Sequence, residues 1–184
     1  MGVVAAQAAH KTLTLLPLLN TIATLTTTGT ILLGTKHMRF YSPPRYRVML
    51  VKESLAYASA VTIRDSQTVY RLLVPLFDGL DREHFLVVGL DAKHAVIGIN
   101  TVSIGSVTMS IVHPREVFKP LILMNASAVL LSHNHPSGDA TPSPEDRALT
   151  RRLKDGGELL GIAVLDHLVL GEDRYYSFAD HQEL

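Results

Sequence analysis

The chain has 184 residues, of which 47% are hydrophobic and 18% charged, a composition that excludes disordered, collagen-like and coiled-coil proteins and suits one compact domain with a short appendage. Its 17 basic and 17 acidic side chains give a formal net charge of zero, which argues against a strongly basic nucleic-acid-binding protein. Cysteine is absent, which excludes disulfides, thiolate nucleophiles and cysteine-ligated zinc, fits a cytoplasmic protein, and leaves nine histidines as candidate metal ligands.

Residues 1–35 differ from the rest because one histidine and one lysine are their only ionisable side chains. Three interpretations are open: a membrane span, a signal peptide, or an extension upstream of a natural start at Met38. Proline, glycine and many threonines weaken the hydropathy and helicity of the segment, so we favour the extension. Pro43-Pro44 marks a break. We therefore expect a poorly ordered N-terminal extension over 1–43 and a domain over 44–184.

The remaining chain alternates segments with strand and helix patterns. Apolar residues recur at helical spacing over 66–80, and a proline at the first helical position opens a second helix over 114–125. A third helix begins with Ser143 as its N-cap, and Gly156-Gly157 is a candidate break in it. The expected strands cover residues 47–52, 85–90, 95–104, 107–111, 128–132, 162–165, 168–170 and 176–178. These elements predict an α/β fold with a mixed β-sheet flanked by helices.

The segment between the 128–132 strand and the third helix carries the candidate chemistry. His133 and His135 are two residues apart in an extended segment, so both imidazoles point to the same side. A loop rich in proline and glycine then turns the chain back, and Asp146 follows in the first helical turn. Two histidines and one carboxylate can hold zinc and leave its fourth position to water. Helix capping alone would explain Ser143 and Asp146, but it does not explain the two histidines.

The spacing of H-x-H, seven residues and S-x-x-D resembles the JAMM motif of the MPN-domain (JAB1/MPN/Mov34) metalloproteases. The matching residues are His133, His135, Ser143 and Asp146. Residues 113–118 and 165–167 are also similar to the RadC-like branch of this family, and the resemblance extends from Val48 to the C-terminus. It implies a cytidine-deaminase-like MPN fold and a Zn²⁺ cofactor held by His133, His135 and Asp146.

The family also uses an upstream glutamate that hydrogen-bonds the catalytic water. The resemblance assigns this role to Glu83, which precedes the first core strand, and Glu116 is the rival. In the implied mechanism zinc activates a water and polarises the scissile carbonyl, and Glu83 carries the proton to the leaving amine. Ser143 would donate a hydrogen bond to the developing oxyanion. We expect Asn134 to be structural, and Asp166-His167 to be a satisfied buried pair rather than a pair that orients a metal ligand.

The leading functional expectation is a zinc metallopeptidase that hydrolyses a peptide or isopeptide bond in a peptide or protein substrate. One alternative is a RadC-type DNA-repair accessory protein. The neutral charge counts against it, and residues 1–35 do not resemble the helix-hairpin-helix region that usually precedes this domain in the family. The other alternative is a metal-free MPN scaffold that binds partners, against which the complete ligand set argues. We do not expect membrane association.

Overall fold

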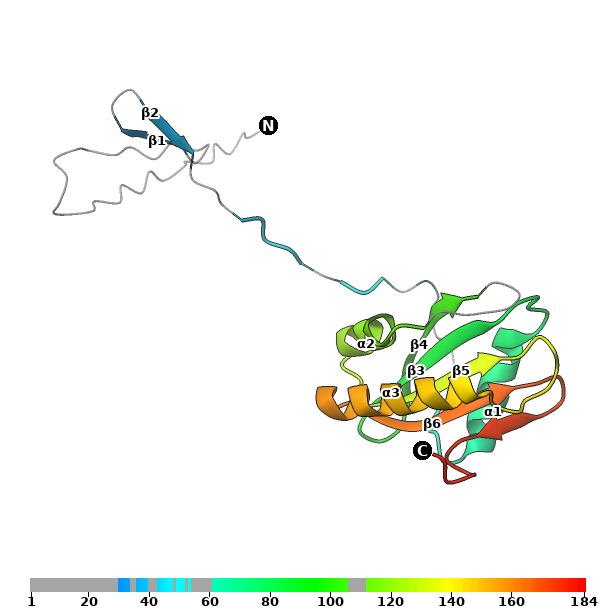
Figure 1. The fold of residues 1–184 in the computed structure, drawn as a ribbon. Coiled ribbons are helices and arrows are strands. Elements are labelled where there is room, and N and C mark those ends of the chain that lie inside the picture. The colour runs from blue at the N-terminus through cyan, green and yellow to red at the C-terminus, as the bar shows by residue number, and fades with distance from the viewer. Residues whose placement is uncertain are drawn as a thin grey trace, which may run out of the picture. The chain divides into compact units, whose positions relative to one another are not determined.

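The computed structural model describes residues 30–33, 36–39, 43–47, 49–51, 53, 61–105 and 112–184. The chain divides into two units, Met1–Val48 and Met49–Leu184. In the first unit, β1 (Thr30–Leu33) and β2 (Lys36–Arg39) pair as an antiparallel hairpin (Figure 1). Apart from residue 43, the rest of the expected extension lies outside the described residues. Within the described residues, no helix combines the length and apolar character needed to span a membrane.

The second unit is built on a five-stranded sheet with the order β4-β3-β5-β6-β7. Its strands are β3 (His84–Leu90), β4 (Val96–Ile104), β5 (Ala128–Asn134), β6 (Ala163–Leu170) and β7 (Tyr175–Ser177). Strands β5 and β6 are parallel, whereas the other neighbouring pairs are antiparallel. The predicted α/β fold with a mixed sheet is thereby confirmed.

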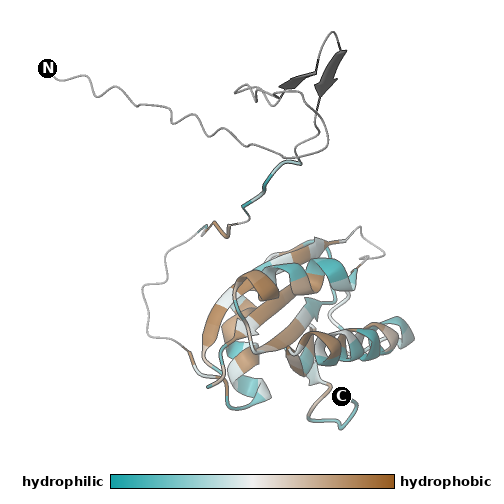
Figure 2. Cartoon of the chain, turned by 90° about the vertical axis from the view of Figure 1, so that its left-hand side faces the viewer, coloured by the Kyte–Doolittle hydropathy of each residue, from teal (hydrophilic) through white to brown (hydrophobic). Residues whose placement is uncertain are grey.

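Three helices cover the sheet in a three-layer arrangement (Figure 1). Helix α1 (Ser66–Phe77) lies on one face, and α2 (Pro114–Leu123) and α3 (Pro144–Leu160) lie on the other. Each face has its own core: Val69, Leu73 and Phe77 of α1 pack on Leu86, Leu130 and Leu168, whereas Val117, Leu121 and Leu153 of α2 and α3 pack on Phe85, Val87 and Leu131. Figure 2 shows hydrophobic strands between helices that carry hydrophilic residues on their outer sides.

Of the expected elements, the strand over 47–52 and the end of the first helix differ in the structure. The strand expected over 47–52 is wrong for its described residues, because residue 47 and residues 49–51 form no strand and are exposed. An apolar run forms a strand only where a neighbouring strand takes up its backbone hydrogen bonds. The strand expected over 107–111 lies outside the described residues. Helix α1 ends at Phe77 rather than at residue 80. Gly79, two residues after the helix, turns the chain with a φ of 70°.

Helix α3 is longer than expected, because it runs through Gly156-Gly157 to Leu160. The reason is close packing: a Cβ atom on Gly157 would lie 2.5 Å from the carbonyl oxygen of Ile162. The helix ends at Gly161, whose φ of 70° suits a glycine C-cap. The two glycines therefore let the helix approach its neighbours rather than break it.

The two strands expected at 162–165 and 168–170 form one strand, β6, that carries a bulge. Val129 pairs with Val164 but Leu130 pairs with Asp166, so one extra residue stands in β6. The bulge changes which residues face α3: Val164 packs with α2 and α3, but Leu168 packs with α1. As a consequence His167 lies on the α3 side of the sheet, where strict alternation from Val164 would have turned it toward α1.

Candidate metal centre

The end of β5 and the start of α3 meet at one edge of the sheet. His133 lies in β5 with 1% of its side chain exposed, and His135 follows the strand with 19% exposed. The loop after them is tied to the β6–β7 turn, because the backbone N–H of His135 donates to Leu170 at 2.8 Å and that of Glu172 donates to Gly138 at 3.0 Å. Gly138 supplies the φ of 82° that the loop requires.

Both histidines and Asp146 converge on one point. The Nε2 atoms of His133 and His135 are 3.1 Å apart, and they lie 3.3 and 3.5 Å from the two carboxylate oxygens of Asp146. One ligand atom from each residue lies within 4.8 Å of the others. The structure therefore brings together the three residues that the sequence singled out as metal ligands, and these residues could hold one metal ion.

The far nitrogen of His135 fixes the tautomer of its ring. Its Nδ1 lies 2.7 Å from the backbone carbonyl of Asp139. A carbonyl oxygen only accepts, so Nδ1 carries the proton, and in the neutral ring Nε2 has a free lone pair. That lone pair faces Asp146 and His133, as a metal ligand requires.

A buried hydrogen-bond chain fixes the ring of His133 in the same way. Thr150 of α3 donates its hydroxyl proton to the carbonyl of Asp146 at 2.7 Å, so it can only accept from His167 Nδ1 at 2.6 Å. Burial lowers the pKa of His167 well below its usual value and keeps the ring neutral. Its Nε2 then accepts from His133 Nδ1 at 2.9 Å, which leaves the Nε2 lone pair of His133 for the metal.

The donor set fits a zinc ion. The Nε2 atoms of His133 and His135 lie 3.1 Å apart and both face the Asp146 carboxylate, so a cation at this point, a proton or a metal ion, meets two nitrogens and one negative charge. Burial raises the pKa of Asp146, but hydrogen bonds to His133 and His135 outweigh burial and hold that pKa well below its usual range. The hydrogen bond to Asp146 raises the pKa of His135, whereas burial acts in the opposite direction. Two histidines and one carboxylate are the ligand set of many catalytic zinc sites.

Ser143 positions Asp146 from the helix start. Its hydroxyl accepts from the Asp146 backbone N–H at 3.1 Å and donates to the Asp146 carboxylate at 2.7 Å, and the carboxylate also accepts from the Ser143 backbone N–H at 2.7 Å. This is a capping box that also orients the candidate ligand. The hydroxyl proton is engaged with the carboxylate, so the oxyanion role expected for Ser143 stays a prediction.

Glu83 faces the same site. It is half-buried, and burial raises the pKa of its carboxyl group while the charges of His133, Asp146 and His135 act on it. Its backbone is clamped on both sides by Asn134, whose amide accepts from His84 N–H at 2.7 Å and donates to the carbonyl of Arg82 at 3.1 Å. The structural role expected for Asn134 is therefore to hold the backbone on both sides of Glu83.

The rival glutamate lies elsewhere. Glu116 is exposed in the first turn of α2, which follows His113 as its N-cap. The charge of Glu83 is among the causes that raise the pKa of His135, and the charges of His133, Asp146 and His135 act on Glu83 in turn. The assignment of the catalytic carboxylate to Glu83 rather than Glu116 stays a prediction.

Sequence reasoning missed Thr150 and underrated His167. Thr150 stands in α3 one turn after Asp146, a spacing that places both on the same side of a helix, and this is the one signal that could have pointed to it. His167 was expected to pair with Asp166. Asp166 does accept from the His167 backbone N–H at 2.7 Å, as well as from Ser177 at 2.6 Å and from the backbone of Ala179 at 2.9 Å, but the His167 ring turns to His133.

Comparison with known proteins gives a consistent match. A family model described as the RadC-like JAB domain matches residues 63–183. A UPF0758 protein of Desulfitobacterium hafniense (strain DSM 10664 / DCB-2) is 52% identical over 118 residues, which cover 64% of this chain and 52% of that protein. A UPF0758 protein of Moorella thermoacetica is 49% identical over 126 residues, covering 68% and 55%. One of Methanococcoides burtonii is 48% identical over 118 residues, covering 64% and 52%. The chain spans about half the length of these curated relatives.

Proposed function

The chain belongs to the RadC-like JAB-domain family, and on that premise we propose that it is a zinc-dependent metallopeptidase that hydrolyses a peptide or isopeptide bond. The observation that supports this proposal most directly is the convergence of the Nε2 atoms of His133 and His135 on the carboxylate of Asp146. His133, His135 and Asp146 would hold the ion. A zinc ion bound there would activate a water molecule at neutral pH and polarise the scissile carbonyl.

The residues of the chain supply the proton transfers. Glu83 would accept the proton of the attacking water and return it to the leaving amine, so that the amide bond breaks as the new carbon–oxygen bond forms. Burial raises the pKa of Glu83, which is the direction that suits a carboxylate acting as a general base. The clamp of Asn134 on Arg82 and His84 holds Glu83 in place during this exchange.

Ser143 would act on the oxyanion. Its hydroxyl group now donates a hydrogen bond to the Asp146 carboxylate, and it would turn to the substrate oxygen if that carboxylate held a metal ion instead. The backbone part of the capping box, from Asp146 N–H to Ser143 Oγ, is compatible with this rotation because the hydroxyl oxygen keeps its acceptor role.

Zinc stoichiometry tests the proposal first. We expect one zinc ion per full chain by elemental analysis, and none in His135→Ala, because that substitution removes one of three ligands. The matched control is His181→Ala, which removes an exposed histidine that contacts Tyr176 and Ser177 outside the site and should keep its zinc. Zinc-loaded protein should then cleave members of a peptide library. Full zinc content in His135→Ala would refute the ligand assignment, and zinc-free wild-type protein would favour the scaffold alternative.

A further inference from the structure

A cavity of about 380 Å³ adjoins the candidate metal centre on the α1 side of the sheet. One wall is the loop that carries His135, and the opposite walls are the end of α1 and the β6–β7 turn. Its apolar lining comes from Tyr70, Val74, Phe77, Leu80 and Leu170. This volume lies within the range of sites that take a small ligand or a single long side chain. We call it the α1 pocket.

The charges of the α1 pocket are one-sided. Asp78 and Glu172 line it, and neither lysine nor arginine stands among its lining residues. Asp78 is the C-cap of α1, whose last turn holds no basic residue. A carboxylate there adds to the negative end of the helix dipole, an arrangement that costs stability unless a cation is near. The pocket therefore combines apolar side chains with two exposed carboxylates, and among its lining residues His135 is the one side chain that can carry a positive charge.

The rim of the α1 pocket is built to keep its shape. Glu172 N–H donates to the Gly138 carbonyl at 3.0 Å, and Gly138 N–H donates to the His135 carbonyl at 2.9 Å. A Cβ atom on Gly171 would collide with the backbone of Gly138, so the two segments are in direct contact. The Tyr70 ring is stacked on Tyr175 at 4.6 Å between centroids. A preformed pocket of this kind binds without the cost of ordering its walls.

We propose that the α1 pocket binds the cationic side chain of a lysine or arginine residue in the substrate. The methylene stem would lie against Val74 and Phe77, the cation would lie near Asp78 and Glu172, and the Tyr70 ring would offer a cation–π face. Because His135 belongs both to the pocket wall and to the candidate metal centre, the bound residue would lie close to the scissile bond. That the occupant is a substrate residue rests on the proposed function, whereas binding of the cation does not.

Binding can be tested on the full chain without metal. The probe is Nα-acetyl-L-arginine amide, compared with the citrulline analogue, in which a neutral urea replaces the guanidinium at almost the same size. In ¹H–¹⁵N spectra we expect the arginine probe to shift the amides of Gly138, Gly171 and Glu172 in a saturable way. Its Kd should be lower than that of the citrulline probe by about fivefold or more, as expected for a cation near two carboxylates.

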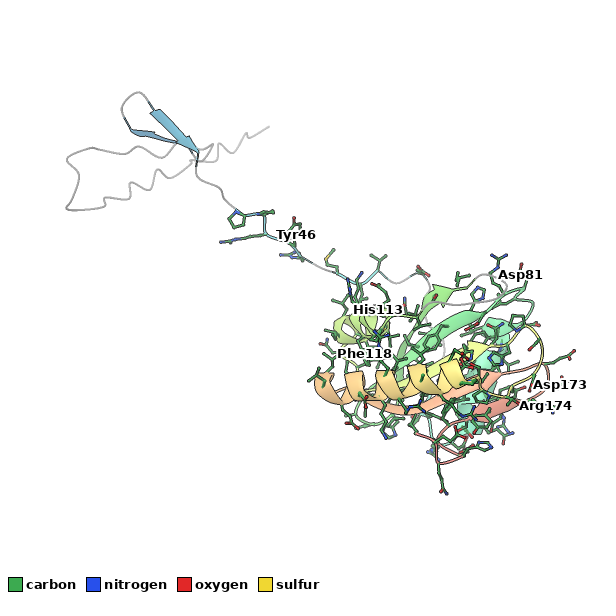
Figure 3. All side chains as sticks on the ribbon, viewed as in Figure 1. Tyr46, Asp81, His113, Phe118, Asp173 and Arg174 are labelled. Carbon is green, nitrogen blue, oxygen red and sulfur yellow. The ribbon has the colours of Figure 1, made fainter. Side chains whose placement is uncertain are left out.

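Variants separate this pocket from general surface attraction. The double variant Asp78→Asn with Glu172→Gln should raise the Kd of the arginine probe by about fivefold or more and leave the citrulline probe unchanged. Asp173→Asn removes one negative charge next to Glu172 in the turn, from a side chain that projects away from the fold (Figure 3), and should change neither Kd. Equal binding of both probes, no shift at the three amides, or an equal effect of Asp173→Asn would overturn the proposal.

Cleavage distinguishes this proposal from the proposed function. If the arginine probe binds as described but zinc-loaded protein cleaves no library peptide, the pocket stands and the peptidase proposal fails. If peptides are cleaved without any preference for lysine or arginine near the scissile bond, the peptidase proposal stands and the role of the pocket in substrate binding is overturned.

Discussion

The ring of His133 is held from behind by a residue that is not itself a ligand. His167 is fully buried and accepts from His133 Nδ1, and Thr150 accepts from His167 in turn. Such partners keep the ligand ring in one tautomer and one orientation, and so raise metal affinity. The chain of three residues ends on the backbone of Asp146, so it also links two of the candidate ligands through the helix.

His167→Phe tests this link, because phenylalanine fills the site but cannot accept a hydrogen bond. We expect zinc affinity, measured by competition with a chelator, to fall by about 10–100-fold, while the thermal unfolding transition stays cooperative. Thr150→Val should weaken zinc binding in the same direction, whereas Thr150→Ser keeps the hydroxyl and should restore it. In ¹⁵N spectra of the metal-free protein, His133 should lose its single Nδ1–H tautomer in His167→Phe. An unchanged zinc affinity and an unchanged His133 tautomer would show that Thr150 and His167 only pack against His133 and do not orient its ring.

Glu83→Gln tests the proton carrier. The amide keeps the size of the side chain but cannot take a proton, so turnover should fall by about 10²–10⁴-fold, a loss of about 3–5 kcal/mol of transition-state stabilisation. Zinc content should remain that of the wild type, since all three ligands are intact. The matched control is Glu116→Gln, which alters an exposed glutamate of α2 and should keep most of the activity. Loss of turnover in Glu116→Gln alone would reverse the two assignments.

At the scale of elements, local patterns located the three helices and the central strands, but packing decided their limits. Helical periodicity identified α1, and the capping residues identified the start of α3. The continuation of α3 through Gly156-Gly157 depends on packing against Phe118, which lies in α2. The bulge in β6 depends on its pairing with β5. Neither partner is visible in a local window of sequence, and so these features could not be predicted.

Gly157→Ala tests whether close packing outweighs helix propensity at this position. Alanine should stabilise an exposed helix position by up to about 1 kcal/mol relative to glycine. Here the added Cβ would lie 2.5 Å from the Ile162 carbonyl and 3.1 Å from Val164, and the backbone must move to admit it. We therefore expect a net destabilisation of about 1–3 kcal/mol in denaturant unfolding. Asp155→Ala, at an exposed position of the same helix, is the control and should change stability little. A stabilised Gly157→Ala would contradict the close contact.

Helix α2 contributes to the same contact from the other side. Phe118, labelled in Figure 3, lies 3.1 Å from the position of a Cβ atom on Gly156 and 3.6 Å from that of one on Gly157. The two glycines of α3 thus leave room for the Phe118 ring to pack against the helix backbone. A sequence-based interpretation of paired glycines as a helix break overlooks this use, because it considers backbone freedom and not the missing side chain.

For the whole molecule, the order of the strands assembles the site. Parallel pairing of β5 with β6 brings His167 beside His133 across 34 residues of sequence. Antiparallel pairing of β3 with β5 brings the segment before His84 to Asn134 across 50 residues. The motif from His133 to Asp146 is local and could be predicted from spacing, and Glu83 could be assigned by resemblance. The supporting residues could not be identified, since their positions depend on strand order.

The second unit should fold by itself. All buried residues of the two core clusters lie between Ile63 and Leu170, so a chain that begins at Met49 keeps every one of them, as does one that begins at Met38. We expect the Met49 chain to unfold in one cooperative transition, with a Tm within about 4 °C of the full chain, the shift that about 1 kcal/mol produces at this size. A chain that begins at His84 loses α1 and exposes the core beneath it, and should aggregate or unfold without cooperativity. If the Met49 chain aggregates while the full chain stays soluble, residues 1–48 contribute to the core and the division of the chain into two units does not hold in solution.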